Sequence, residues 1–274
     1  MLNVSALLKQ HGLRPDKAMG PNFLIDEHHL ERIVAAAGVT VSDEVLEVGP
    51  GLGSLTRHLA ATARRVVAVE LDSALFPILR ETVREFPNVE IVHGDILQVE
   101  LGKYLHADGF LVVANIPYYL TSNLIRHLLE GQPRPARLVL TVQKEVAERA
   151  CSNPPSMSLL ALSVQVYGKP RIAHHIPAGA FYPSPKVDSS VLVIDLYPEP
   201  LLPEDKLDGF FRLAKAAFQQ KRKTLANSLA SMPNVTKTEA QARLAAAGID
   251  AFRRPQTLTL EEWGRLLEID TQKT

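Results

Sequence analysis

Short apolar runs alternate with amphipathic segments over the first two thirds of the chain. The runs are rich in Val, Ile and Leu, as in strands buried in a sheet, and the segments between them space their apolar residues as helices do. Strands separated by helices favour βαβ units and a mostly parallel sheet. The predicted strands are Glu44–Val48, Arg65–Leu71, Val89–His93, Phe110–Ala114, Arg137–Val142, Leu160–Tyr167 and Ser190–Leu196; the predicted helices are Glu27–Ala37 (with Asp26 as N-cap), Gly53–Thr62, Ser73–Phe86, Thr121–Leu129 and Lys144–Cys151.

The pattern changes near residue 200. The segment YPEPLLPED, at 197–205, contains three prolines and is typical of a linker. Beyond it the apolar spacing is helical only. We therefore predict an α/β domain over residues 1–199 and a small all-α domain over 200–274, with helices at Leu207–Gln219, Lys223–Ala230, Thr238–Ala246 and Leu260–Glu268.

The composition is that of an ordinary globular protein, with 46% hydrophobic and 22% charged residues among 274. One cysteine, Cys151, excludes an intramolecular disulfide and suits a reducing compartment. No run has membrane-spanning length, so we expect a cytoplasmic protein without a membrane partner. The pairs His28–His29 and His174–His175 lack metal-ligand spacing; we interpret them as surface or loop residues and expect no metal.

Charge is unevenly distributed although 30 basic and 30 acidic residues cancel. Residues 209–238 contain six basic residues and no Asp or Glu, which leaves 24 basic and 30 acidic residues elsewhere. Such a segment is either a solvated helix face or a surface that binds phosphates. Its basic residues are Arg212, Lys215, Lys221, Arg222, Lys223 and Lys237.

A glycine-rich loop follows the first predicted strand. In EVLEVGPGLGSLT, at 44–56, Gly49, Gly51 and Gly53 allow a tight turn and close approach of a ligand. Glu70 ends the next strand, where an acid can hold two ribose hydroxyls, and Asp95 follows the third, where it can accept from an adenine amino group. The carboxyl ends of parallel strands share one sheet edge, so these groups predict a nucleotide site there.

The spacing GxGxG differs from the dinucleotide GxGxxG, which disfavours NAD. Together the three signals resemble the core of class I S-adenosylmethionine-dependent methyltransferases. The resemblance implies a Rossmann-like fold, S-adenosylmethionine as cofactor and S-adenosylhomocysteine as product. It also implies cofactor contacts from Glu47, Gly49, Gly51, Glu70, Leu71, Asp95, Ile96 and Asn115.

The sequence Asn115-Ile116-Pro117-Tyr118 follows the fourth strand. It resembles the NLPY form of the motif in methyltransferases that act on nucleobase amines, although an isolated NxP is more often an ordinary turn. The Asn115 side-chain oxygen and the Ile116 carbonyl can accept both N–H bonds of an adenine amine and direct its lone pair at the methyl group. Pro117 would fix this backbone, and Tyr118 would stack on the base. Catalysis would then be mostly positioning.

Two further motifs extend the resemblance to the rRNA adenine N6-dimethyltransferases. AFYPSPKVDSSV, at 180–191, resembles FxPxPxVxS, in which Phe181 would face the target base; the alternative is a core phenylalanine. KAMGPNFL, at 17–24, resembles KxxGQNFL, which implies cofactor contacts from Asn22 and Leu24. Pro21 stands where the family has Gln, so no hydrogen bond from that side chain carries over.

QKEVAER at 143–149 and FQQKRKTLANSL at 218–229 match the bacterial branch known as KsgA. This implies dimethylation of N6 on two adjacent adenosines in a hairpin near the 3′ end of 16S rRNA, during ribosome biogenesis. The helical domain, through Arg212, Lys215, Lys221, Arg222 and Lys223, would dock a monomeric enzyme on the immature 30S particle. The alternatives are the Erm branch, which modifies large-subunit rRNA, and a non-catalytic assembly or transcription factor on the same fold.

Overall fold

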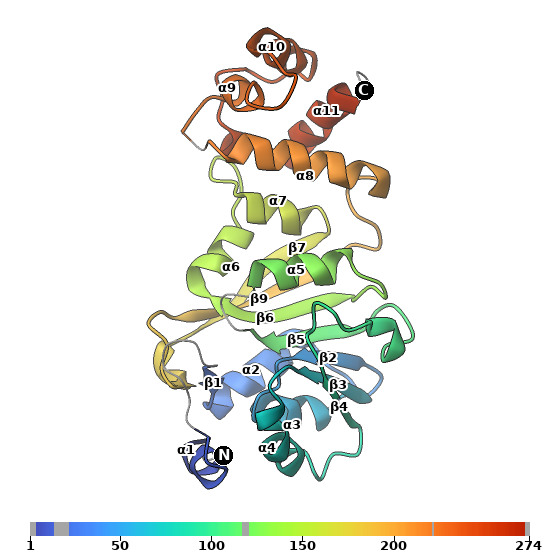
Figure 1. Ribbon diagram of the computed structural model, residues 1–274, viewed down its shortest axis with the longest axis vertical. Coiled ribbons are helices and arrows are strands. Elements are labelled where there is room, and N and C mark those ends of the chain that lie inside the picture. The colour runs from blue at the N-terminus through green and yellow to red at the C-terminus, as the bar shows by residue number, and fades with distance from the viewer. Residues whose placement is uncertain (1–3, 14–21, 117–120, 221, 272–274) are drawn as a thin grey trace. The chain divides into compact units, whose positions relative to one another are not determined.

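The computed structural model describes residues 4–13, 22–116, 121–220 and 222–271 (Figure 1). The chain divides into two compact units, one of residues 1–147 and 169–196 and the other of residues 148–168 and 197–274. The strands are β1 Phe23–Leu24, β2 Glu44–Val48, β3 Arg65–Glu70, β4 Val89–His93, β5 Leu111–Asn115, β6 Arg137–Gln143, β7 Gly168–Ile176, β8 Phe181–Tyr182 and β9 Ser189–Leu196. The α-helices are α1 Val4–Gln10, α2 Glu27–Ala37, α3 Ser54–Ala60, α4 Phe76–Thr82, α5 Thr121–Glu130, α6 Lys144–Ala150, α7 Leu159–Gln165, α8 Glu204–Phe218, α9 Leu225–Leu229, α10 Lys237–Ala246 and α11 Leu260–Thr271.

The first unit is built on a seven-stranded sheet of order β4-β3-β2-β5-β6-β9-β7. The strands from β4 to β6 pair in parallel, with Val48 opposite Val69 and Val45 opposite Leu111. Strand β9 pairs antiparallel with β6. The mostly parallel α/β sheet is therefore confirmed. Strand order reverses between β2 and β5, the position at which open α/β sheets bind ligands.

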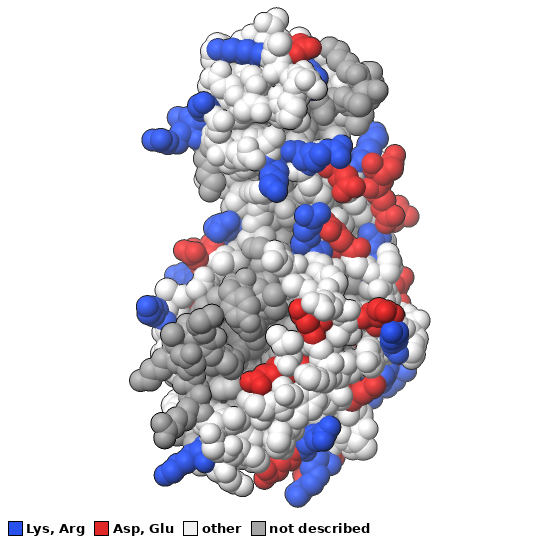
Figure 2. All heavy atoms as spheres, viewed as in Figure 1, with Lys and Arg blue, Asp and Glu red and all other residues white. Residues whose placement is uncertain are grey.

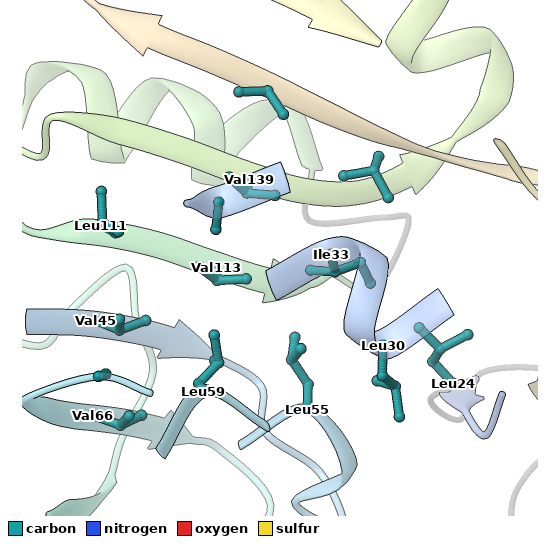
Figure 3. Close-up of a cluster of buried hydrophobic side chains, with 14 of the residues drawn as sticks. Leu24, Leu30, Ile33, Val45, Leu55, Leu59, Val66, Leu111, Val113 and Val139 are labelled. Carbon is teal, nitrogen blue, oxygen red and sulfur yellow. The ribbon is translucent and has the colours of Figure 1, made fainter. Parts of the chain in front are cut away.

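Helices α2 and α3 cover one face of this sheet and form a hydrophobic core with it (Figure 3). Asp26 caps α2 as predicted, since its side chain accepts a hydrogen bond from the His29 N–H. Ile33 and Leu59, from the two helices, are fully buried with the branched residues of β2 and β5. Burial of this apolar surface holds the carboxyl ends of the strands in fixed positions.

The second unit is helical. Helix α8 packs against α7, α9 and α11, and Trp263 and Phe210 are fully buried within it. The rings of Phe218 and Trp263 stack with centroids 6.0 Å apart. Helix α10 begins with a capping box formed by Thr236 and Glu239. Within the described part of the chain, no helix is long and apolar enough to cross a membrane.

Several sequence predictions need correction. The strand predicted at Leu160–Tyr167 is wrong, because this apolar run forms α7, whose first turn is capped by the Ser158 hydroxyl. Strand β7 was not predicted, since its burial alternates along a polar sequence. His174 lies in that strand with 8% of its surface exposed, so its assignment to the surface is also wrong. The division expected at 199/200 lies near Tyr197, but residues 148–168 pack with the second unit.

Candidate active site

The glycine loop between β2 and α3 has the left-handed backbone that its sequence favours. Gly49 has φ 67° and Gly51 φ 58°. A Cβ at Gly51 would lie 3.0 Å from the Phe23 ring, whereas one at Gly49 would have no heavy atom within 4 Å. The loop is therefore packed on one side at Gly51 and open to a ligand at Gly49.

Glu70, at the end of β3, is tied to this loop. Its Oε2 accepts from the Gly51 N–H at 2.9 Å, and its Oε1 accepts from the Asp72 N–H at 2.9 Å. Burial raises the pKa of Glu70, while these backbone hydrogen bonds oppose the rise. The side chain that the sequence assigns to a ribose is thus fixed in direct contact with the glycine loop.

Glu47 occupies a different environment. It lies in β2, is 1% exposed, and its Oε2 has no hydrogen-bond partner within the described segments. Burial raises the pKa of Glu47 to about 8, and the nearby charge of Glu70 adds to the rise. The carboxyl is therefore mainly protonated at neutral pH and lies below the surface that a ligand would contact.

The third strand contributes Asp95, two residues after the end of β4. Asp95 is half-buried, and its Oδ1 accepts from the Leu97 N–H at 3.0 Å, which fixes the turn. Ile96 is 4% exposed and Leu71 is 60% exposed. Because β4, β3 and β2 are adjacent and parallel, Asp95, Glu70 and the glycine loop lie along one sheet edge.

Asn115 ends β5, the next strand along the same edge. Its side-chain Nδ2 donates to the backbone oxygen of Asn22, 3.1 Å away. This contact joins two motifs 93 residues apart and fixes the amide plane. The Asn115 oxygen has no hydrogen-bond donor among the residues that the structure describes, so it can accept from a ligand. Ile116 is 2% exposed, and its N–H donates to the Thr141 oxygen.

Phe181 and Leu24 lie opposite each other in the small β1–β8 ladder. Both are 3% exposed and belong to the same core cluster, in which Figure 3 labels Leu24. Of the two interpretations of Phe181, this burial favours the core residue over a base-facing ring. Pro117, Tyr118 and Pro21 lie outside the described residues, so their roles stay predictions.

The basic segment of the second unit is exposed where it is described. Arg212 and Lys215 lie one turn apart on α8, and Arg222 and Lys223 follow that helix. All four side chains are exposed, and basic side chains project from the region of α8 to α11 in Figure 2. Lys221 lies outside the described residues.

Sequence reasoning missed the support beneath the glycine loop. Helix α1 buries Val4 and Leu8 against Phe23, Leu52 and Leu75, and Leu52 belongs to the loop itself. The apolar spacing of VSALLKQ at 4–10 is the signal that predicts an amphipathic helix there. Helix α1 thus packs against the glycine loop.

Three comparisons identify relatives of this chain. The sequence model of the family described as "Ribosomal RNA adenine dimethylase" matches residues 13–268. "Ribosomal RNA small subunit methyltransferase A" of Dehalococcoides mccartyi strain CBDB1 is 41% identical over 97% of this chain and 92% of the relative. The protein of the same name from Alkaliphilus metalliredigens is also 41% identical, over 95% of this chain and 93% of the relative.

Two solved structures share the fold over most of both chains. The 23S rRNA methyltransferase ErmE has a TM-score of 0.72 at 30% identity, covering 90% of this chain and 99% of its own. A dimethyladenosine transferase from Plasmodium falciparum has a TM-score of 0.79 at 26% identity, covering 92% and 98%. With its Rossmann-like methyltransferase sheet and the match over residues 13–268, this chain belongs to the ribosomal RNA adenine dimethylase family.

Proposed function

We propose that this chain transfers methyl groups from S-adenosylmethionine to N6 of two adjacent adenosines in a hairpin near the 3′ end of 16S rRNA. One observation carries the proposal. Asn115, at the ligand-binding edge of the sheet, has its amide nitrogen bound to the Asn22 carbonyl and its oxygen free of described donors. An amide held in this way is suited to accept an N–H from an adenine amine.

The glycine loop and three strand ends suit the proposed cofactor. Gly49 leaves room for close approach, Glu70 can accept from ribose hydroxyls with its remaining lone pairs, and Asp95 can accept from the adenine amino group. Leu71 offers exposed apolar surface beside Glu70. S-adenosylmethionine supplies the electrophilic methyl group when it is bound.

The residues after β5 would position the target amine. The Asn115 oxygen and the Ile116 carbonyl accept its two N–H bonds, which aims the nitrogen lone pair at the methyl carbon. The new N–C bond forms as the S–C bond breaks, and the amine then releases a proton to solvent. Pro117 would hold the Ile116 carbonyl, and Tyr118 would stack on the base. The second methylation gives up one of the N–H contacts.

The two relatives named above for the small subunit are each 41% identical to this chain, whereas ErmE, named for 23S rRNA, is 30% identical. This difference favours small-subunit rRNA as substrate. We place the reaction in the cytoplasm, on an immature 30S particle, with a monomeric enzyme. The exposed cations Arg212, Lys215, Arg222 and Lys223, with Lys221, would contact RNA phosphates.

The test is methyl transfer from labelled cofactor to under-methylated small subunits, followed by mapping of the modified bases. Asn115→Ala should lower the rate by at least about a hundredfold, because the amine loses its positioning acceptor, while subunit binding stays nearly unchanged. Asn123→Ala, an exposed asparagine on α5, is the matched control and should keep full activity. Near-normal dimethylation by the Asn115 variant would refute the positioning role. Methylation of large-subunit rRNA alone would refute the proposed substrate.

A further inference from the structure

An aromatic ring projects into solvent from the turn between α10 and α11. Phe252 is 77% exposed and is the one aromatic residue among the exposed large hydrophobic residues of the described segments. Its N–H donates to the Asp250 Oδ1 at 2.9 Å, which fixes the turn before it. Arg253 then anchors the chain, since its Nη2 donates to the Glu262 Oε2 at 3.0 Å. An ordered backbone therefore holds this ring in solvent.

The turn lies beside the basic segment. The Leu225 N–H donates to the Arg253 oxygen at 2.7 Å, and the Ala226 N–H donates to the Ala251 oxygen at 3.3 Å. These contacts hold the backbone on both sides of Phe252 against the start of α9, which closely follows Arg222 and Lys223 in the chain.

The exposed charged residues close to this turn, along the chain or across these backbone contacts, are mostly basic. Arg222, Lys223 and Arg254 are exposed, and none has an acidic partner in the described segments. Of the two acids in these contacts, Glu262 pairs with Arg253, whereas Asp250 accepts from a backbone N–H and keeps its negative charge. An exposed apolar ring beside unpaired cations differs from an apolar patch that binds another protein.

Unpaired nucleotides combine the two features that such a surface can bind. Their phosphates attract cations, and their bases stack on aromatic rings irrespective of sequence. We propose that Phe252 is a stacking platform for an unpaired base of the RNA on which the helical unit docks. This inference rests on the proposed function and adds a contact with a base to a surface that would otherwise bind only phosphates.

Phe252→Ala tests the proposal, with Phe252→Trp retaining a ring and Leu201→Ala, at another exposed apolar residue, as control. The probes are under-methylated small subunits, a single-stranded oligoadenylate and an RNA duplex of equal length. We expect Phe252→Ala to bind subunits and the single strand about tenfold more weakly, and the duplex normally. The Trp variant and the control should match the unaltered chain. The slope of log affinity against log salt should not change, since no charge is removed.

Three results would overturn the proposal: unchanged affinity of Phe252→Ala for the single strand, failure of Phe252→Trp to restore it, or equal losses on the single strand and the duplex. Weaker binding to subunits alone would assign Phe252 to a ribosomal protein and also refute stacking. Absence of methylation by the unaltered chain would refute the proposed function separately, because the binding comparison does not depend on turnover.

Discussion

At the scale of single residues, two glutamates near the glycine loop differ in their hydrogen bonds. Glu70 accepts hydrogen bonds from two backbone N–H groups, of Gly51 and Asp72. In Glu70→Gln an amide nitrogen replaces one acceptor, so one of these N–H groups loses its partner. We expect cofactor binding to weaken roughly ten- to a hundredfold, measured by calorimetry. Glu85→Gln, at an exposed glutamate after α4, should bind normally.

Glu47→Gln is the informative companion to that variant. Because burial raises the pKa of Glu47 to about 8, its carboxyl is mainly neutral at pH 7 and glutamine resembles it in charge. Cofactor affinity at pH 7 should therefore stay close to that of the unaltered chain. A loss as large as that of Glu70→Gln would show that Glu47 acts as a carboxylate at the site. The sequence motif alone does not separate the two acids, since burial depends on the packed sheet.

At the scale of elements, periodicity predicted most of the sheet that carries the site. Strands β2 and β4 have their predicted bounds, β3, β6 and β9 differ from theirs by one residue at one end, and β5 is shifted by one residue at both ends. The failures have physical causes. An apolar run such as Leu159–Gln165 is compatible with a strand or a buried helix, and packing in the second unit decides for the helix.

The contact of Asn115 with Asn22 shows a second feature that could not be predicted from the sequence. The sequence assigned both residues to the site, but only the fold shows that the amide of one binds the backbone of the other. Likewise, the FxPxPxVxS motif assigned Phe181 to the site, but the motif alone does not show that this side chain is buried in the core. Motifs identify which residues matter, whereas their mutual orientation follows from long-range packing.

The packing of α2 against β7 predicts a loss of stability in acid. His174 stacks on His29 with ring centroids 5.7 Å apart, and Arg32, His28 and His175 add positive charge nearby. Burial and then these charges lower the pKa of His174 to about 4 from 6.5. Above pH 6.5 the His174 ring is neutral in both the folded and the unfolded chain, so its protonation does not change the free energy of unfolding. As the pH falls towards 4, the unfolded chain alone gains the proton, and the folded state loses up to about 3 kcal/mol.

His174→Phe keeps an aromatic ring in the stack but cannot bind a proton. Its free energy of unfolding, measured in urea, should fall less between pH 7 and pH 5 than that of the unaltered chain. His106→Phe, at an exposed histidine, corrects for the loss of one imidazole. If His174→Phe and the unaltered chain lose equal stability over this interval, protonation of His174 does not govern the acid response.

At the scale of the whole molecule, a net charge of zero conceals a basic helical segment. Association with RNA releases counterions from the phosphates that are contacted, so the salt dependence of binding counts those contacts. The double variant Arg222→Ala/Lys223→Ala removes two exposed cations of the second unit. The slope of log affinity against log salt should become shallower by roughly 1.4 to 1.8, since each of the two phosphate contacts contributes about 0.7 to 0.9. Affinity for small subunits should fall most at low salt.

A matched double variant separates local contact from total charge. Arg84→Ala/Lys169→Ala removes two exposed cations from the first unit and changes the net charge equally. If only the overall field attracts RNA, both variants should flatten the slope alike, because a long-range field depends on total charge. If residues 209–238 contact phosphates directly, only Arg222→Ala/Lys223→Ala should flatten the slope. An unchanged slope in Arg222→Ala/Lys223→Ala would remove these two residues from the RNA interface, and the neighbouring role of Phe252 would then need another electrostatic partner.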